Sequence, residues 1–301
     1  MPNIAAIDLG SNSFHMLIVS TKDGINSPLF QCGRRVQLGA DMHDGTMTDE
    51  AIQRGLACLR DYRAIILQHN VKITLTAATS ALRIASNSAV FCRQASLILD
   101  CDINIISGEH EAKLIYLGVI TSTPLQGKQM VVDIGGGSTE FILGENSNVQ
   151  YADSVSLGCL SHFQKYYNDS SLNAEKFQRS VDNAKAQIGN ISAYYESAIG
   201  HIGIGCSGVV EAILSVIQHC HWGEQITMDG LSKARTSLLK QFSDVYDVRF
   251  EGLRSDRRAL FVAGLAIMIA IFEILKPSAI IHVNSALREG IIVNYLHPYS
   301  R

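Results

Sequence analysis

The chain has 301 residues, 47 % of them hydrophobic, and a net charge of only −3. This length predicts roughly two domains, each large enough for its own core. The charge excludes the basic excess that is typical of nucleic-acid-binding proteins, so we expect no nucleic-acid partner. The seven cysteines are dispersed without a CxxC pair, and the N-terminus does not resemble a signal peptide. Both features predict a cytoplasmic protein with free thiols.

The first part of the chain alternates strand and helix patterns. Strands are expected at 3–8, 14–20, 72–78 and 103–106, and helices at 48–69, within 80–93 and at 108–119. Thr48 is the expected N-cap of the first helix, and Asp49 and Glu50 favour its N-terminal dipole. A polar stretch follows at 124–128. We therefore predict a boundary near residue 120, with domains 1–120 and 121–301.

The second part repeats the scheme with more helix. Strands are expected at 130–134, 138–144, 149–155, 201–205 and 279–283, and helices at 159–167, 172–198, 208–218, 228–242, 256–275 and from 285 onward. Strands followed by helices predict two α/β domains with mixed sheets. The apolar run 259–272 is shorter than a bilayer span requires, so we expect a buried core helix and no membrane partner.

One short pattern occurs twice, once near the start of each predicted domain. It begins at Asp8 and again at Asp133, and each copy reads Asp, apolar, Gly, two small residues and Ser between strand-like runs. This pattern predicts a β-hairpin whose Gly-rich tip presents backbone N–H groups to phosphate oxygens. The candidate phosphate-binding residues are Gly10, Ser11, Asn12, Ser13, Gly135, Gly136, Gly137, Ser138 and Thr139. For each copy alone, the alternative is an ordinary turn. Neither copy fits a Rossmann fingerprint or a P-loop.

Five motifs in order resemble the exopolyphosphatase/guanosine pentaphosphate phosphatase (Ppx/GppA) family. They begin at Ala6, Ile106, Val132, Gly205 and Leu287 and read AIDLGSNS, ISGxxEA, VDIGGGSTE, GCSG and LREG. The resemblance implies two actin/Hsp70/sugar-kinase-like (ribonuclease H-like) domains around an interdomain cleft, and we expect substrate to close that cleft. The chain looks like the short, two-domain form of the family.

The resemblance also implies an activity and the residues that carry it. Family members hydrolyse a terminal phosphate from inorganic polyphosphate, or convert guanosine pentaphosphate (pppGpp) to ppGpp, with Mg²⁺ or another divalent cation. Glu111 matches the residue that activates the attacking water, and Arg83 matches an arginine that binds phosphate. The alternative for Glu111 is a carboxylate that merely complements a helix dipole.

The expected metal ligands are Asp8, Asp133 and Glu140. Mg²⁺ takes only one or two protein carboxylates, so not all three are expected to coordinate directly, and Glu140 is alternatively a solvated strand residue. Further phosphate contacts are expected from Ser207, Gly208 and Arg257. His15 is expected to pack rather than react.

Three departures from the family pattern leave the substrate preference open. They are His110, Lys113 and the segment 283–285, and they do not touch the expected catalytic and metal-binding acids. Two other functions stay open. One is an ATP-dependent kinase of small molecules, and the other is a regulator that binds polyphosphate or the guanosine alarmone without turnover. A homodimer also stays open.

Overall fold

The structure, a computed structural model, describes residues 2–22, 27–40, 42, 44–123 and 127–298. The chain forms two compact units, Met1–Pro124 with Ser285–Arg301, and Leu125–Asn284. This grouping differs from the predicted division into 1–120 and 121–301. The physical reason is the last helix, α10 (Leu287–Leu296), which packs on α4 (Gly108–Ser122) and so returns to the first unit.

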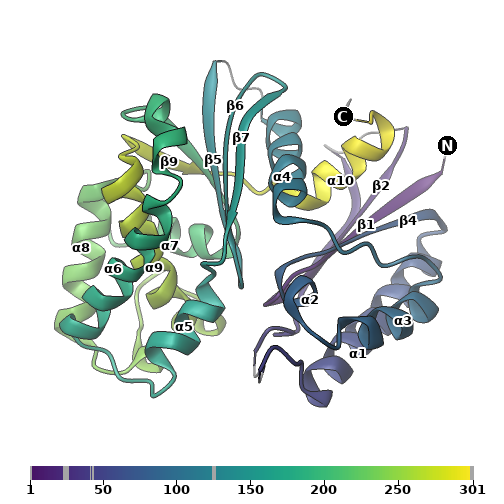
Figure 1. Cartoon of the computed structure of the whole chain (residues 1–301), viewed down its shortest axis with the longest axis horizontal. Helices are drawn as coiled ribbons and strands as arrows, with labels where there is room; N and C mark the ends of the chain where they lie inside the picture. Colours follow the sequence, from purple (N-terminus) through teal and green to yellow (C-terminus); the bar gives the residue numbers. More distant parts are fainter. Residues whose placement is uncertain (1, 23–26, 41, 43, 124–126, 299–301) are drawn as a thin grey trace. The chain divides into compact units, whose positions relative to one another are not determined.

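The first unit contains a four-stranded mixed sheet (Figure 1). Its strands are β1 (Asn3–Leu9), β2 (Ser13–Ser20), β3 (Pro28–Arg35) and β4 (Val71–Ala78), in the order β3-β2-β1-β4. β1 is antiparallel to β2 and parallel to β4. β3 was not expected, because it is a mostly exposed strand with little apolar alternation. The strand predicted at 103–106 is reduced to one bridge between Ala78 and Ile105.

Helices cover both faces of this sheet. They are α1 (Asp49–Gln68), α2 (Ser80–Ile84), α3 (Ser88–Leu99), α4 and α10. α1 and α3 lie on one face and α4 and α10 on the other (Figure 1). α1 begins as predicted, because the Thr48 hydroxyl accepts a hydrogen bond from the backbone N–H of Ala51 at 3.2 Å.

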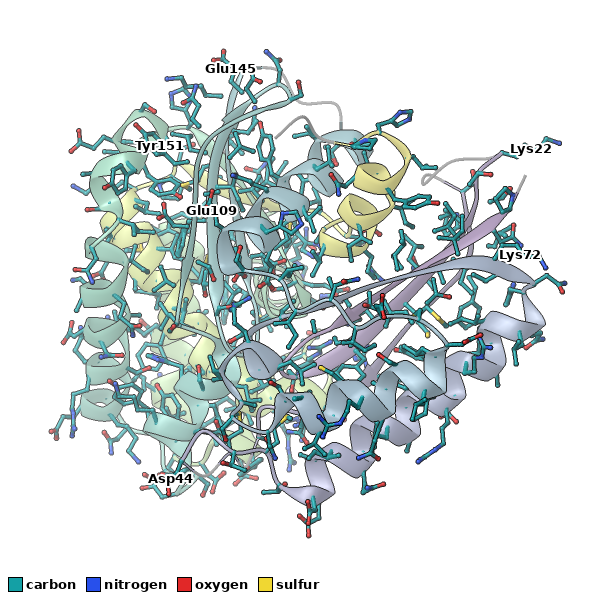
Figure 2. The ribbon with its side chains drawn as sticks, turned by 45° about the vertical axis from the view of Figure 1, so that its right-hand side comes forward. Lys22, Asp44, Lys72, Glu109, Glu145 and Tyr151 are labelled. Carbon is teal, nitrogen blue, oxygen red and sulfur yellow. The ribbon has the colours of Figure 1, made fainter. Side chains whose placement is uncertain are left out.

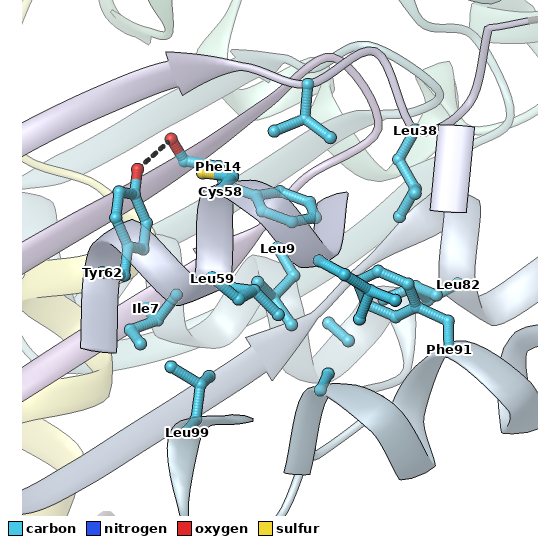
Figure 3. Close-up of a cluster of buried hydrophobic side chains, with 14 of the residues drawn as sticks. Ile7, Leu9, Phe14, Leu38, Cys58, Leu59, Tyr62, Leu82, Phe91 and Leu99 are labelled. Atoms are coloured by element: carbon cyan, nitrogen blue, oxygen red, sulfur yellow. Dashed lines mark hydrogen bonds between the residues drawn. The ribbon is translucent and has the colours of Figure 1, made fainter. Parts of the chain in front are cut away.

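The apolar core of the first unit lies between β1, β2, α1 and α3 (Figure 3). Ile7 and Leu9 alternate along β1 and pack against this side of the sheet. The Tyr62 hydroxyl donates to the Phe14 carbonyl at 2.8 Å, so the buried phenol is paired. Phe14 also packs edge-on against Phe91. These contacts fix β2 immediately after the first Gly-rich turn.

A pair of glycines lets α4 and α10 touch through their backbones. A Cβ atom added to Gly118 would lie 2.0 Å from the Ala286 carbonyl oxygen, and one added to Gly290 would lie 1.8 Å from the Leu114 carbonyl oxygen. Both distances are too short for any side chain. The glycine of the Leu-Arg-Glu-Gly motif is therefore required for packing.

The second unit repeats the strand order of the first and adds one strand. Its strands are β5 (Lys128–Ile134), β6 (Thr139–Glu145), β7 (Asn148–Val155), β8 (Ile202–Cys206) and β9 (Ala279–His282), in the order β7-β6-β5-β8-β9. β5 is antiparallel to β6 and parallel to β8, as β1 is to β2 and β4. The duplication predicted from the two sequence motifs is therefore present in the topology.

Helices of the second unit gather around one apolar helix. They are α5 (Cys159–Tyr167), α6 (Ala174–Gly189), η1 (Ser192–Ala198), α7 (Gly208–His219), α8 (Met228–Gln241), η2 (Val245–Asp247), η3 (Ser255–Arg257) and α9 (Arg258–Leu275). The helix predicted over 172–198 is interrupted between α6 and η1. The segment Ser255–Leu275 is long and apolar enough to span a membrane, but 78 % of its most apolar stretch is buried within the protein. α9 is thus the core helix that the sequence predicts.

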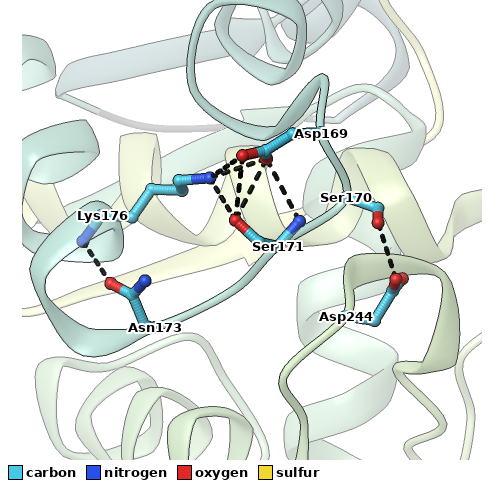
Figure 4. A network of polar contacts seen from close by, with 6 residues as sticks. All are labelled: Asp169, Ser170, Ser171, Asn173, Lys176 and Asp244. Carbon is cyan, nitrogen blue, oxygen red and sulfur yellow. Dashed lines mark hydrogen bonds and ion pairs between the residues drawn. The ribbon is translucent and has the colours of Figure 1, made fainter.

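A polar network fixes the start of α6 (Figure 4). Asp169 pairs with the Lys176 ammonium at 2.6 Å, and the Asn173 side chain accepts from the Lys176 backbone N–H at 2.9 Å. The Ser170 hydroxyl donates to Asp244 at 2.7 Å. The loop between α5 and α6 is thereby tied both to the helix that follows it and to the segment before η2.

The glycine contact between α4 and α10 gives a stability prediction. Gly290→Ala places a methyl group where a backbone carbonyl lies, so we expect a loss of about 2 kcal/mol or more in the free energy of unfolding, measured by chemical denaturation. Gly189→Ala is the matched control, because a Cβ there meets nothing within 4 Å. Equal stabilities of the two variants would contradict the proposed backbone contact.

Candidate functional site

The carbonyl groups of the first Gly-rich turn are bound from one side by the loop after β3. The Ser11 carbonyl accepts from the Gly39 N–H at 2.9 Å. The Asn12 carbonyl accepts from the N–H groups of Val36 and Gln37 at 3.0 and 2.8 Å. The turn between β1 and β2 is therefore held rigidly, with its carbonyls directed into the protein.

The side chains of this turn have different uses. The Ser11 hydroxyl is buried and accepts from the Ala81 N–H at 3.0 Å, which joins the turn to the start of α2. The Asn12 amide donates to the Ser13 hydroxyl at 3.2 Å, while its Oδ1 is buried without a hydrogen-bond partner among the described residues. If the Asn12 amide is rotated by 180°, its oxygen accepts a hydrogen bond from the Ser13 hydroxyl. Its two N–H donors then take the position that Oδ1 had.

Asp8 has an unexpected partner. Asp8 and His15 are directly opposite on β1 and β2, and His15 Nδ1 lies 3.5 Å from Asp8 Oδ2. Gly33 faces the same imidazole from β3, and a Cβ atom there would lie 2.6 Å from His15 Cδ2. His15 therefore does more than pack. The seven-residue spacing, which also separates Asp133 from Glu140, is the sequence signal that points to this pair.

The two predicted catalytic residues lie together in the first unit. Glu111 is 6 % exposed in the first turn of α4, and its Oε2 lies 3.0 Å from Arg83 Nη1. The same Nη1 donates to the Ile106 carbonyl at 2.9 Å. A guanidinium has five N–H donors, so these two bonds do not exhaust Arg83.

A second acid in the same helical turn has a different environment. Glu109, labelled in Figure 2, is exposed near the start of α4. Its carboxylate lies 2.6 Å from the Lys113 ammonium. Such an exposed pair, together with the N-terminal dipole, is a common way to stabilise a helix start. Glu111 is instead buried against an arginine. The helix-dipole role thus suits Glu109 better than Glu111.

The second Gly-rich turn is held from behind by the start of α5. The Gly135 carbonyl accepts from the Cys159 N–H, and the Gly136 carbonyl from the Leu160 N–H, both at 2.9 Å. Gly158 has no room for a side chain, since a Cβ atom would lie 2.2 Å from the Gly136 carbonyl oxygen. As in the first unit, the tip carbonyls are directed into the protein.

Two observations on β6 bear on the predicted site. Thr139 is fully buried and its hydroxyl donates to the Leu157 carbonyl, so a phosphate contact of Thr139 would be made by its backbone. Glu140 is not a solvated strand residue, because it is 1 % exposed and accepts from the Ser154 hydroxyl at 2.7 Å. Asp133 lies directly opposite Glu140, so both carboxylates belong to the same face of the sheet.

The start of α7 brings further predicted residues together. Ser207 joins β8 to α7 with a φ of 80°, and its Oγ is buried without a hydrogen-bond partner among the described residues. Gly208 lies under the Arg257 guanidinium, whose Nη2 would be 2.7 Å from an added Cβ. The residue before Ser207, Cys206, pairs with Asp133 in the sheet. The second hairpin and the α7 N-terminus are thus neighbours within this unit.

The Cys159 thiol lies in the same neighbourhood. Burial raises the pKa of Cys159 to about 12, Arg257 opposes that rise, and Asp133 adds to it. A thiol with so high a pKa is protonated at neutral pH and is a poor nucleophile. Cys159 is therefore a structural residue.

The carboxylates suit a cation that takes only one or two ligands from the protein, rather than a site made entirely of protein ligands. In the part of the chain that the structure describes, no group of three or more His, Cys, Asp or Glu side chains could hold a metal ion. Asp133 and Glu140 form one cross-strand pair. Mg²⁺ commonly takes one or two carboxylates and completes its shell with water and substrate phosphate, so this pair fits its chemistry.

The fold and these residues define a class: a two-unit α/β protein with an Asp-bearing, Gly-rich hairpin in each unit. The chain belongs to the Ppx/GppA phosphatase family, because residues 17–298 match the sequence pattern of that family. The family resemblance inferred from the five motifs is confirmed.

Curated relatives agree with this assignment. The chain is 35 % identical over 291 residues to a guanosine-5'-triphosphate,3'-diphosphate pyrophosphatase of Aliivibrio fischeri (strain MJ11), covering 96 % of this chain and 58 % of the relative. A relative of the same name from Pseudoalteromonas translucida is 37 % identical over 294 residues, covering 97 % and 59 %. The chain therefore spans less than two thirds of the length of these relatives.

Solved structures share the fold. An exopolyphosphatase from Cytophaga hutchinsonii matches with a TM-score of 0.88 at 23 % identity, covering 99 % of both chains. A Ppx/GppA family member from Aquifex aeolicus matches with a TM-score of 0.79 at 24 % identity, also covering 99 % of both. The predicted class, two α/β units with mixed sheets, is confirmed.

The helix that supports the second turn should make the protein sensitive to acid. His162 on α5 is 3 % exposed and bonded through Nε2 to the Ser180 carbonyl, and burial lowers its pKa to about 4. In the unfolded chain the histidine pKa is about 6.5. Between this pH and the pKa of the folded chain, the unfolded chain therefore binds more protons than the folded chain. Stability should therefore fall by roughly 2–3 kcal/mol as the pH drops from about 6.5 to 4. His162→Gln should flatten this dependence in denaturation curves.

The exposed His201 provides a matched control for this experiment. His201→Gln should keep the full acid dependence of the parent protein. If His162→Gln and the parent lose stability in parallel over this pH range, another group is responsible for the dependence.

Proposed function

We propose that this chain hydrolyses phosphoanhydrides, releasing the terminal phosphate of inorganic polyphosphate or converting pppGpp to ppGpp. The observation that carries the proposal is the ion pair between the buried Glu111, at the start of α4, and the partly buried Arg83 of α2. The pyrophosphatase names of the relatives support a substrate of the guanosine pentaphosphate type. We therefore propose both substrates that the family resemblance implies, polyphosphate and pppGpp.

Glu111 is the proposed base. An adjacent arginine favours the ionised carboxylate, which is the form that orients a water molecule and accepts its proton. The water oxygen forms a bond to the terminal phosphorus, the bridging P–O bond breaks, and the water proton passes to Glu111. Most of the remaining catalysis is positioning and neutralisation of phosphate charge.

We propose that each unit carries backbone and side-chain donors that bind phosphate oxygens. Because the tip carbonyls are bonded to the protein behind them, the tip N–H groups are the donors that suit an anion. Arg83 and Arg257 supply guanidinium groups. The proposed phosphate-binding residues are Gly10, Ser11, Asn12, Ser13, Arg83, Gly135, Gly136, Gly137, Ser138, Thr139, Ser207, Gly208 and Arg257.

Mg²⁺ is the proposed cation, held by Asp133 and Glu140. When bound, it would neutralise charge on the phosphate chain. Asp8 is a weaker candidate ligand because its carboxylate already lies beside His15. The pair in the second unit places two carboxylates on one face, and carboxylate oxygens are the protein ligands that Mg²⁺ prefers.

We also propose a cytoplasmic location, without a nucleic-acid or membrane partner. The proposal rests on the dispersed cysteines, which a reducing compartment would keep as thiols. A homodimer remains open and is checked by the mass of the purified protein in solution.

The decisive experiment measures phosphate released from defined-length polyphosphate, pppGpp and ATP. Release from either of the first two substrates, with little from ATP, supports the proposal. Phosphate transfer from ATP to a small-molecule acceptor would favour the kinase alternative. Tight binding of polyphosphate or pppGpp without any release would favour the regulator.

Glu111→Gln should lower kcat at least ~10²-fold, because the amide cannot accept the water proton. Substrate binding should be largely retained, as measured by calorimetry. Glu109→Gln is the matched control, since Glu109 is exposed in the same helical turn. Near-normal turnover of a folded Glu111→Gln variant would remove Glu111 from the mechanism.

Asp133→Asn should raise the Mg²⁺ concentration needed for half-maximal activity, because one charge of the carboxylate pair is lost. Direct Mg²⁺ titration by calorimetry should show the same weakening. Asp229→Asn, at an exposed position of α8, is the control. Overlapping titrations of Asp133→Asn and the parent would place the cation elsewhere.

A further inference from the structure

A short loop after β3, residues 36–40, supports the first Gly-rich turn, and we call it the support loop. Val36, Leu38 and Ala40 are buried, and Figure 3 shows Leu38 in the core cluster of the first unit. Gly39 lies against the turn, since a Cβ atom there would be 3.2 Å from Ser11 Cβ. The support loop is therefore anchored in the core and in close contact with the turn.

Gln37, in the middle of this loop, has a left-handed backbone conformation. Its φ is 54°, a value that residues with a Cβ atom rarely adopt. Its N–H donates to the Asn12 carbonyl at 2.8 Å, and its own carbonyl accepts from the Ala40 N–H at 3.1 Å. Such a conformation persists only when the surrounding structure holds it in place.

Arg54 of α1 binds two consecutive carbonyls of the support loop. Its Nε donates to the Val36 carbonyl at 3.0 Å, and its Nη2 donates to the Gln37 carbonyl at 3.1 Å. The planar guanidinium presents these two donors in a fixed geometry, and hydrogen bonds from a charged donor are stronger than those between neutral groups. Arg54 therefore holds the loop backbone on both sides of the Gln37 residue.

Two peptide groups in series connect Arg54 to the tip of the turn. The Val36–Gln37 peptide accepts from Arg54 at its oxygen and donates through its N–H to the oxygen of the Asn12–Ser13 peptide. Both peptides are trans, so the Ser13 N–H points away from the support loop. A charged donor at one end of such a chain polarises each peptide group, which makes its N–H a better donor.

We propose that Arg54 is a positioning residue for the first Gly-rich turn. By fixing the support loop, it holds the Asn12–Ser13 peptide with its N–H directed toward a bound phosphate group. The phosphate contact rests on the proposed function, whereas the hold on the support loop does not. Arg54 acts through the loop and does not itself contact substrate.

The kinetic test uses variants of Arg54 with tripolyphosphate as the probe. Arg54→Gln should raise KM roughly 10-fold while changing kcat less than about threefold. Arg54→Lys keeps the charge but loses the planar pair of donors, so its KM should fall between those of Arg54→Gln and the parent. Arg60→Gln, at an exposed position of the same helix, is the control and should match the parent.

Three kinetic results would overturn the proposal. The first is an unchanged KM in Arg54→Gln, and the second is a loss confined to kcat. The third is an Arg54→Lys variant with the KM of the parent, because positive charge alone would then be sufficient.

A second test does not depend on catalysis. Amide hydrogen exchange measured by NMR follows the N–H groups of Val36 and Gln37, which both donate to the Asn12 carbonyl. Arg54→Gln should speed their exchange by about 10-fold, and Arg60→Gln should leave it unchanged.

The two tests together separate the possible roles of Arg54. A raised KM with unchanged exchange would mean that Arg54 binds substrate directly, and faster exchange with an unchanged KM would mean a purely structural role; either result would overturn the proposal. If the parent neither binds nor hydrolyses tripolyphosphate but the exchange difference is seen, the proposed function fails and the hold of Arg54 on the support loop stands.

Discussion

The hydrogen bonds behind the two Gly-rich turns are the interaction on which both candidate sites depend. In each unit, backbone N–H groups from a later segment bind the carbonyls of the turn. The donors come from the loop after β3 in one unit and from the first turn of α5 in the other. Unrelated segments thus serve the same purpose, because small residues contribute few side-chain contacts and the backbone of the turn must be held from outside.

The two hairpins share a backbone plan but differ in charge. The position opposite the aspartate is His15 in the first unit and Glu140 in the second. At the first turn an imidazole lies beside Asp8, whereas the second turn has two carboxylates on one face, which is the type of ligand that a hard cation prefers. This difference is the physical reason to expect unequal cation affinity at the two turns.

Much of this arrangement could be predicted from the sequence, because the relevant signals are local. The two Asp-Gly turns, the Thr48 cap and the apolar helix α9 follow from residue type and spacing alone. The edge strand β3 could not be predicted, since its exposed residues carry no apolar alternation. The hydrogen bond from the Thr139 hydroxyl to the Leu157 carbonyl depends on a tertiary contact, which the spacing of residues in the sequence does not reveal.

The site residues divide in the same way. The pairing of Glu111 with Arg83 agrees with the family motifs, but the burial of Glu111 could be seen only in the folded chain. The positive φ of Ser207 also could not be read from spacing, because it is a property of the folded backbone. The sequence identifies Gly290 only as part of the LREG motif. The backbone contact between α4 and α10 explains why this position requires glycine.

That backbone contact has a consequence for the order in which the chain acquires structure. The second unit is one continuous segment, whereas the first unit needs α10, which follows α4 by more than the whole second unit. During synthesis on the ribosome, the glycine-bearing surface of α4 therefore stays uncovered until the last helix emerges. The second unit can reach its native state first. The unit that carries Glu111 is therefore completed only after the second unit has been synthesised.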